Sequence, residues 1–123
     1  MKVLICMLFF HLIDDYTLQG WLASAKSKDW WKKNCPDEKY KNDYKIALIE
    51  HSFMNSFAIH IPIFIWCCKN EIVLSLSIIM ATLWHCYIDN LKANIKCFNL
   101  IQDQIMHIVF IIILWSIYYF LGA

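Results

Sequence analysis

Three pairs of histidine and aspartate share one spacing in this sequence, in which the two residues are four positions apart. The pairs are His11 with Asp15, His85 with Asp89, and Asp103 with His107. On an α-helix, side chains four residues apart project from the same face, one turn apart. With five histidines and seven aspartates in 123 residues, random placement gives on the order of half of one such pair. The three pairs therefore indicate one shared site.

Imidazoles and carboxylates gathered in a buried layer suit a divalent transition metal. A neutral imidazole nitrogen binds the ion at about 2.1 Å, and carboxylates cancel its charge. His51 supplies one more imidazole, with Asn55 four residues further on. In an up-and-down helix bundle these groups converge at one depth. The sequence therefore predicts one or two Zn²⁺ or Mn²⁺ ions, with ligands drawn from His11, Asp15, His51, His85, Asp89, Asp103 and His107.

A structural interpretation competes with the metal site. Each pair could be a local hydrogen bond that allows an imidazole and a carboxylate to tolerate burial. For a single pair this interpretation is the better one. Three pairs at one depth, together with His51, favour a metal.

Other polar residues near the predicted layer have weaker assignments. On a helix, Asp14 points about 100° away from Asp15, and we expect it to support a ligand or to face the interface. His60 lies about 13 Å along a helix from His51, and we expect a packed histidine there. The residues that flank the layer could bind an anionic substrate or orient ligands, and they are Gln19, Lys92 and Gln104.

The aspartates exceed the needs of one metal ion, so one of them is available as a general base. The candidates for a catalytic aspartate are Asp15, Asp89 and Asp103. Asp89 is preferred because it lies about one helical turn before Lys92, whose ammonium group could hold a phosphate.

Four apolar segments must position these residues. They cover residues 2–22, 45–68, 71–89 and 104–122. Each is near the ~20 residues that cross about 30 Å of hydrocarbon at 1.5 Å per residue, although His11, Asp14 and Asp15 interrupt the first. Helices are expected, because backbone groups in lipid must be satisfied within the segment. Pro62 could kink the second helix.

Composition supports a membrane-spanning chain with a single domain, residues 1–123. The apolar fraction is 60% and the mean hydropathy is +0.47. A soluble domain of this size could not bury that much apolar surface. The net charge of +1, with lysines and acidic residues mixed in one segment, gives no signal for nucleic acid. We therefore predict an all-α, polytopic, four-helix transmembrane bundle in the lipid bilayer, with homo-oligomerisation left open.

The polar stretch between the first two segments indicates an interface and an orientation. Trp30 and Trp31 adjoin Lys32 and Lys33, as in a short interfacial helix with its rings at headgroup depth. Nine of the eleven lysines lie in the first and third loops. By the positive-inside rule these loops face the cytoplasm of a bacterial cell, and both termini lie outside the cytoplasm, with the helices in the inner membrane.

The N-terminus and the cysteines have simpler interpretations. Lys2, an apolar run and the small residues Ala23 to Ala25 imitate a signal peptide. Charged residues interrupt the apolar run, so we expect no cleavage. The six cysteines form no CxxC pair and no regular framework, and we expect free thiols.

Four motifs resemble those of a known family, in the same order across nearly the whole chain. They are HLIDDYTLQ from His11, His51 with Asn55, HCYIDNLK from His85, and DQIMH from Asp103. The sequence is similar to a family of small integral-membrane proteins of bacteria and their phages, domain of unknown function 3307. Asn55 departs from the family pattern, which has a second histidine there, and this puts the position in doubt as a ligand.

The resemblance implies membrane-bound, metal-dependent hydrolysis, since the family resembles hydrolases of that kind. A site at headgroup depth beside lysines and tryptophans favours a phosphate ester, of a lipid or a nucleotide, as the substrate. One alternative is a metal or ion carrier, which needs polar groups in both halves of the membrane. The other is a small non-catalytic adaptor, in which the His/Asp pairs only fix the helix register.

Overall fold

The computed structural model describes residues 1–67 and 69–121, and within these ranges every regular element is helical. The α-helices described are α1 (Lys2–Ile13), α2 (Leu22–Ala25), α3 (Lys28–Asn34), α4 (Asp43–Trp66), α5 (Glu71–Asn90) and α6 (Leu100–Leu121). The π-helical turns η1 (Asp14–Leu18) and η3 (Leu91–Ile95) extend α1 and α5, and a short 3-10 helix, η2 (Glu38–Tyr40), precedes α4. The predicted all-α class is confirmed.

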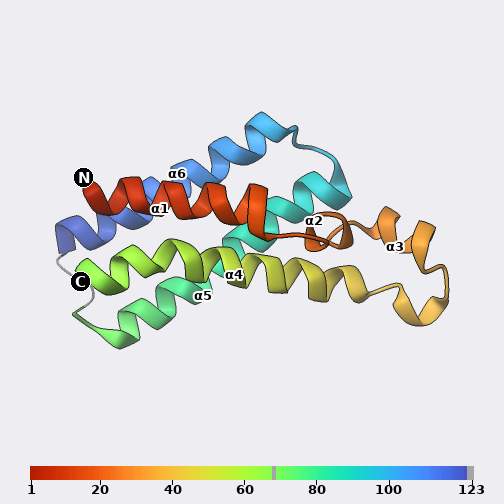
Figure 1. Cartoon of the computed structure of the whole chain (residues 1–123), viewed down its shortest axis with the longest axis horizontal. Coiled ribbons are helices and arrows are strands. Elements are labelled where there is room, and N and C mark those ends of the chain that lie inside the picture. The colour runs from red at the N-terminus through yellow and green to blue at the C-terminus, as the bar shows by residue number, and fades with distance from the viewer. Residues whose placement is uncertain (68, 122–123) are drawn as a thin grey trace.

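Four helices, α1, α4, α5 and α6, lie along the long axis of the molecule (Figure 1). α4 packs against α1 and α5, and α6 packs against the same two helices. The start of α1 and the end of α6 lie at one end of this bundle, whereas α2, α3 and the polar connection to α4 lie at the other (Figure 1). Groups on different helices can therefore meet at one depth along the bundle.

Three helical stretches are long and apolar enough to cross a membrane, namely Glu38–Trp66, Glu71–Ile95 and Leu100–Phe120. The first predicted span is shorter, since α1 has 12 residues, or roughly 18 Å at 1.5 Å per residue, before its backbone widens into η1. Within the described residues, three of the four predicted spans therefore correspond to helices that could cross a membrane, and a bundle of four transmembrane helices is not confirmed. Residues 68 and 122, which end two of the predicted segments, lie outside the described residues.

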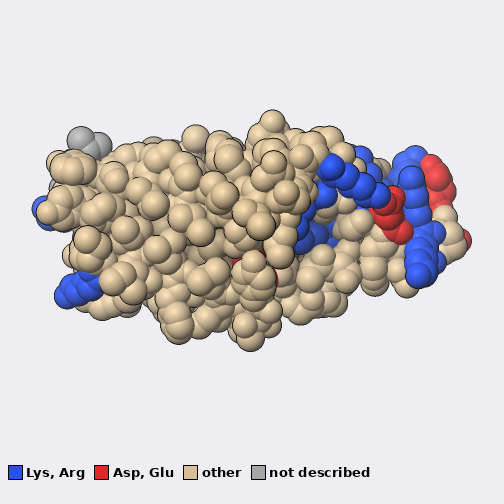
Figure 2. Space-filling model, turned by 90° about the horizontal axis from the view of Figure 1, so that it is seen from above, with Lys and Arg blue, Asp and Glu red and all other residues tan. Residues whose placement is uncertain are grey.

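The outward faces of the helices are apolar, whereas part of the interior is charged. Large apolar side chains that face outward include Leu83, Ile113 and Phe120, which are 61%, 52% and 77% exposed. On the face seen in Figure 2, residues other than Lys, Asp and Glu cover most of the surface, and the charged side chains gather mainly at one end. Such a surface suits lipid better than water. Together with the three candidate spans, it indicates a membrane protein, as predicted.

An apolar core fills the half of the bundle nearer the chain ends. Its buried members include Met7 of α1, Ile63 of α4 and Ile111 of α6. Pro62 lies inside α4 next to this core, and α4 continues past it to Trp66. The charged interior therefore begins only beyond this core, toward α2 and α3.

The cysteines follow the prediction of free thiols within the described residues. Those observed to be free are Cys6, Cys35, Cys67, Cys86 and Cys97. Cys68 lies outside the described residues.

Candidate metal centre

The residues predicted as metal ligands gather in one buried cluster, to which α1, η1, α4, α5 and α6 all contribute. Each is less than a tenth exposed, and they are His11, Asp15, His51, His85, Asp89, Asp103 and His107. The spacing of four residues puts His85 and Asp89 on one face of α5. It does the same for Asp103 and His107 on α6. Burial of so many ionisable groups costs free energy unless the groups bind partners.

A π-helical turn at the end of α1 brings two adjacent aspartates into the cluster. In η1 the backbone N–H of Gln19 donates to the carbonyl oxygen of Asp14 at 3.1 Å, five residues back along the chain. This turn is wider than that of an α-helix, and both Asp14 and Asp15 are buried. The two carboxylates still reach different atoms of His51, since Asp14 Oδ2 lies 4.0 Å from Nδ1 and Asp15 Oδ1 lies 3.1 Å from Nε2. This suits the expected role of Asp14 in supporting a ligand. Gly20, whose φ of +51° is readily adopted only by glycine, then turns the chain toward α2.

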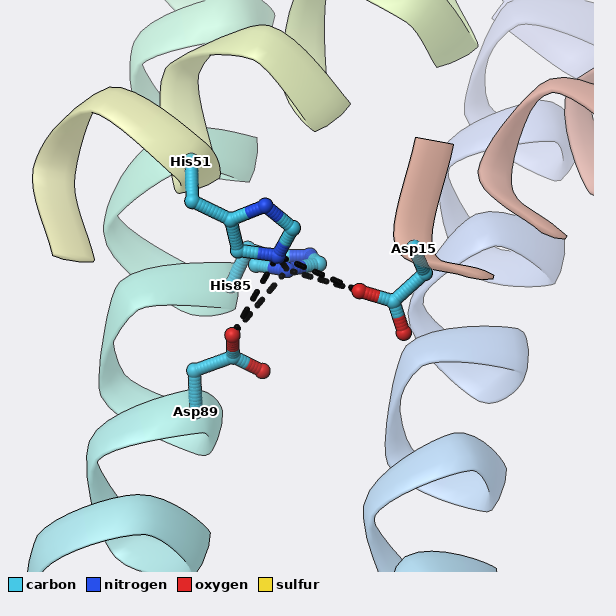
Figure 3. Close-up of side chains that lie close together, drawn as sticks. All are labelled: Asp15, His51, His85 and Asp89. Atoms are coloured by element: carbon cyan, nitrogen blue, oxygen red, sulfur yellow. Dashed lines mark hydrogen bonds and ion pairs between the residues drawn. The ribbon is translucent and has the colours of Figure 1, made fainter. Parts of the chain in front are cut away.

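Four ligand atoms from η1, α4 and α5 converge on one point (Figure 3). His51 Nε2 lies 3.1 Å from Asp15 Oδ1 and 3.3 Å from Asp89 Oδ2. The same nitrogen lies 3.1 Å from His85 Nε2. His85 Nε2 lies 3.9 Å from Asp15 Oδ1 and 3.6 Å from Asp89 Oδ2. These four residues are the first ligand group, and their ligand atoms all lie within 4.8 Å of one another.

The separations in the first ligand group bracket those expected around a four-coordinate metal. Zinc binds imidazole nitrogen and carboxylate oxygen at about 2.0–2.2 Å, so the edges of its coordination tetrahedron are about 3.3–3.6 Å. The separations given above run from 3.1 to 3.9 Å. Hydrogen bonding explains them less well, because His51 Nε2 has either one lone pair or one N–H and faces three possible partners.

A second ligand group, Asp89, Asp103 and His107, shares Asp89 with the first. His107 Nε2 lies 3.2 Å from Asp89 Oδ1 and 3.5 Å from Asp103 Oδ1. Asp89 thus offers Oδ2 to the first group and Oδ1 to the second. Asp103 Oδ1 is buried and has no hydrogen-bond partner among the described residues.

His11 lies in the cluster but belongs to neither ligand group. Its ring nitrogens each lie 3.3 Å from an amide oxygen, Nδ1 from Asn55 and Nε2 from Gln104. Asn55 Nδ2 also donates to Asp14 Oδ2 at 3.1 Å. That oxygen lies 4.0 Å from His51 Nδ1, on the side of the ring away from the ligand atoms. The contacts of His11, Asn55 and Asp14 suit residues that orient ligands.

The residues predicted to bind substrate all contact the cluster. Gln104 Nε2 donates to Asp15 Oδ2 at 2.7 Å. Lys92 Nζ lies 2.7 Å from Asp103 Oδ2. Gln19 donates to the backbone carbonyl oxygen of Asp15. The sequence left two roles open for these residues, binding of an anionic substrate and orientation of ligands. Their contacts with the cluster suit the orientation of ligands.

Lys26 is the residue of the cluster that sequence analysis missed. It is 7% exposed, and its Nζ lies 2.6 Å from Asp89 Oδ2. The same Nζ donates to Gln19 Oε1 at 3.2 Å. No sequence signal separates Lys26 from the other lysines of the polar stretch. Its burial depends on the turn at Gly20 and on the packing of α2 against α4.

The cluster contains more carboxylates than ammonium groups. Its carboxylates belong to Asp14, Asp15, Asp89 and Asp103, and its ammonium groups to Lys26 and Lys92. With the imidazoles neutral, two negative charges stay uncompensated between apolar helices, which is costly. One divalent cation would compensate them.

Polar contacts from η3 and the connection after it hold Lys26 at the cluster. Asn94 Nδ2 donates to the carbonyl oxygen of Lys26 at 3.1 Å, and Asn94 Oδ1 accepts from the backbone N–H of Lys28 at 2.8 Å. Lys96 Nζ donates to Asp29 Oδ2 at 2.5 Å, and this hydrogen bond lowers the pKa of the Asp29 carboxyl. The end of α5 and its connection to α6 are thus tied to α3 and the turn before it.

His60 lies outside both ligand groups, on the side of the apolar core. Its ring Nδ1–H donates to the carbonyl oxygen of Ser56 at 2.7 Å, and Nε2 lies 3.0 Å from Ser77 Oγ. Both nitrogens are therefore hydrogen-bonded, as suits the packed histidine that the sequence predicts.

Comparison with known proteins extends the sequence resemblance. The model of a family described as protein of unknown function (DUF3307) matches residues 3–123. No curated protein and no solved structure matches the chain. The matched range covers nearly the whole chain and includes every residue of both ligand groups. The chain therefore belongs to the DUF3307 family of proteins of unknown function.

Proposed function

We propose that this protein is a membrane-embedded, metal-dependent hydrolase of phosphate esters. The observation that carries the proposal is the first ligand group, in which Asp15, His51, His85 and Asp89 converge at separations suited to a tetrahedral ion. Zinc and manganese both accept such a mixture of imidazole nitrogen and carboxylate oxygen. The charge of one divalent ion also balances the two excess carboxylates of the cluster.

The residues around the ion have separate tasks. A divalent ion bound there, on taking a water molecule as a fifth ligand, would lower the pKa of that water toward about 7 and polarise an ester oxygen. Asp14 faces Nδ1 of His51 and orients that ring. Gln104 holds the second oxygen of Asp15, and Lys26 holds Asp89, so that both carboxylates stay directed at the ion.

The candidate catalytic aspartates differ in how far their oxygens are engaged. Asp89, preferred from the sequence as the base, has one oxygen in each ligand group. Both oxygens of Asp15 also have polar partners. Asp103 alone, among these aspartates, keeps an oxygen without a hydrogen-bond partner in the described residues. Asp103 is therefore the carboxylate that is best able to accept a proton or to bind a further ligand.

A phosphate ester suits the charge at the polar end of the bundle. The side chain of Lys92 is 30% exposed, whereas that of Lys26 is 9% exposed, so Lys92 is the more accessible of the two ammonium groups. Lysines of the first and third loops lie at the same end, and they attract an anionic substrate. We infer from the positive-inside rule that this end faces the cytoplasm and that both termini face the other side.

Metal reconstitution with activity assays tests the proposal. The protein in lipid nanodiscs is stripped with a chelator, reloaded with Zn²⁺ or Mn²⁺, and incubated separately with a phospholipid phosphate ester and with a nucleotide. We expect phosphate release in one of these two arms, lost on chelation and restored by metal. His51→Ala should abolish it. His60→Ala, a change at a buried histidine outside the cluster, is the matched control and should retain it.

The outcomes separate the possible functions. Activity with the lipid or with the nucleotide identifies the source of the phosphate ester. A metal-loaded protein that is inactive on both would reject the hydrolase and leave a metal-binding adaptor or carrier. A protein that binds no metal would leave a hydrogen-bonded cluster that only fixes the helix register.

A further inference from the structure

The second ligand group contains a buried oxygen that nothing in the described residues satisfies. Asp103 is 0% exposed, and its Oδ1 has no hydrogen-bond partner there. The atom lies 3.5 Å from His107 Nε2, beyond a good hydrogen bond. An unpartnered carboxylate oxygen in an apolar bundle is costly, so the site implies a partner for it.

Two further atoms of the second group face the same point. His107 Nε2 lies 3.2 Å from Asp89 Oδ1 and 3.5 Å from Asp103 Oδ1. The Oδ2 atoms of both aspartates have cationic partners, which are Lys26 for Asp89 and Lys92 for Asp103. One nitrogen and two oxygens are thus available as a set of three ligands, with separations like those in the first group.

We propose that the protein holds a second divalent ion, bound by Asp89 Oδ1, Asp103 Oδ1 and His107 Nε2, with Asp89 bridging the two ions. This inference rests on the proposed function, since the first ion is the one placed in the first ligand group. A carboxylate that bridges two ions is the usual arrangement in two-metal hydrolytic sites, where the pair holds both the attacking and the leaving oxygen.

Charge decides how the second ion is accommodated. One divalent ion already balances the four carboxylates and two ammonium groups of the cluster. A second ion adds two positive charges, so it competes with the ammonium groups that contact its ligands, Lys26 on Asp89 and Lys92 on Asp103. The side chain of Lys92 is 30% exposed and that of Lys26 is 9% exposed, so Lys92 is the one that can move out toward solvent. Lys92→Met should therefore bind the second ion at least as tightly as the wild type does.

Metal stoichiometry tests the second ion independently of activity. Protein in nanodiscs is loaded with Mn²⁺, dialysed against a fixed free Mn²⁺ concentration, and analysed for ions per chain and by electron paramagnetic resonance. We expect two ions per chain and an exchange-coupled signal in the wild type. Asp103→Asn should bind one ion and give the signal of isolated Mn²⁺. The exposed Asp37→Asn is the matched control and should bind two.

Each of the remaining outcomes would overturn a defined part of the proposal. One ion per chain in both the wild type and Asp103→Asn rejects the second site and leaves the first intact. Two ions in Asp103→Asn with lost phosphate release makes Asp103 a general base rather than a ligand. No ion in the wild type rejects the first site as well, and with it the proposed function. Circular dichroism establishes that Asp103→Asn is folded, and His107→Ala repeats the test from a second ligand.

Discussion

At the residue scale, His51 Nε2 gives the clearest indication of what the cluster binds. It lies within 3.3 Å of two carboxylate oxygens and of another imidazole nitrogen. A single ring nitrogen has one N–H or one lone pair, so it cannot satisfy all three neighbours at once. A cation between them satisfies all four atoms. The alternative is an imidazolium paired with the carboxylates. Substitutions distinguish the two, because removal of a ligand lowers the metal content of a metal site, whereas an ion-paired cluster holds no metal to lose.

His85→Ala removes one nitrogen from the first ligand group. We expect metal affinity to fall by more than the roughly 10–100-fold that loss of an orienting residue costs. Elemental analysis of purified protein, after dialysis against buffered Zn²⁺, measures the change. His60→Ala serves as the control, because its hydrogen bonds to Ser56 and Ser77 lie outside the cluster. Equal metal content in both variants would mean that the cluster is a hydrogen-bonded core.

Asp89→Asn tests whether Asp89 is a ligand or the general base preferred from the sequence. Because Asp89 has one oxygen in each ligand group, the neutral amide should weaken metal binding and phosphate release together. Paired measurements of metal content and turnover on the same preparation decide the matter. Full metal content with lost turnover would instead support the role of base.

At the element scale, helical periodicity was sufficient to predict part of the site from the sequence. Asp89 lies one turn beyond His85 on α5 whatever the surroundings, and the sequence could therefore predict that they share a face. The turn η1 could not be predicted, because its wider backbone comes from tertiary packing that buries Asp14 and Asp15 together. Lys26 was missed for the same reason, since its position depends on the path of a loop and not on helical spacing.

The first predicted span shows the same limit of prediction from sequence, over a longer stretch of the chain. The sequence predicted a helix over residues 2–22, and the α-helix ends at Ile13. From there η1, Gly20 and α2 curve the chain around the cluster. The interruption by charged residues was visible in the sequence, but the path of the backbone after it depends on the partners those residues find.

The start of α5 provides a test of stability that is separate from the metal. Asn70 Oδ1 accepts hydrogen bonds from the backbone N–H groups of Ile72 at 2.9 Å and Val73 at 3.2 Å. Asn70→Ala should lower the free energy of unfolding by about 1 kcal/mol, measured by denaturant titration in mixed micelles. Metal content should not change, since the cap is at the far end of α5 from Asp89. Asn34→Ala, at an exposed site in α3, is the control and should cost less.

At the scale of the whole molecule, the polar and apolar layers argue against a carrier. Beyond the cluster, the half of the bundle near the chain ends is filled by an apolar core that includes Met7, Ile63 and Ile111. The polar side chains described there include His60, which bonds to Ser77, and Ser77 Oγ lies 2.7 Å from Tyr118 Oη. A transported ion needs polar groups through both halves of the membrane. The described residues therefore favour a site that opens at one end only.

The N-terminal segment is expected to stay attached to the rest of the chain. Ala25, the last residue of the signal-like region, is fully buried, and Trp31 Nε1 donates to its carbonyl oxygen at 2.6 Å. Cleavage after it would also remove Asp15 from the first ligand group. Intact mass spectrometry of the membrane-extracted protein should show that residues 1–25 are retained. A mass lower by the first 25 residues would contradict both the fold and the metal site.

The last prediction concerns the side of the membrane on which the site opens. Nine of the eleven lysines lie in the connections that contain Cys35 and Cys97, so both thiols should face the cytoplasm. In variants that retain only one of these cysteines, a membrane-impermeant maleimide should label neither thiol in intact spheroplasts and should label both after lysis. Lys69→Cys, in an otherwise cysteine-free chain, places a thiol at the other end and should be labelled in both conditions. The reverse pattern would put the lysine-rich end and the metal site outside the cytoplasm, where a cytoplasmic nucleotide could not reach them, and only the lipid phosphate ester would then remain as the substrate.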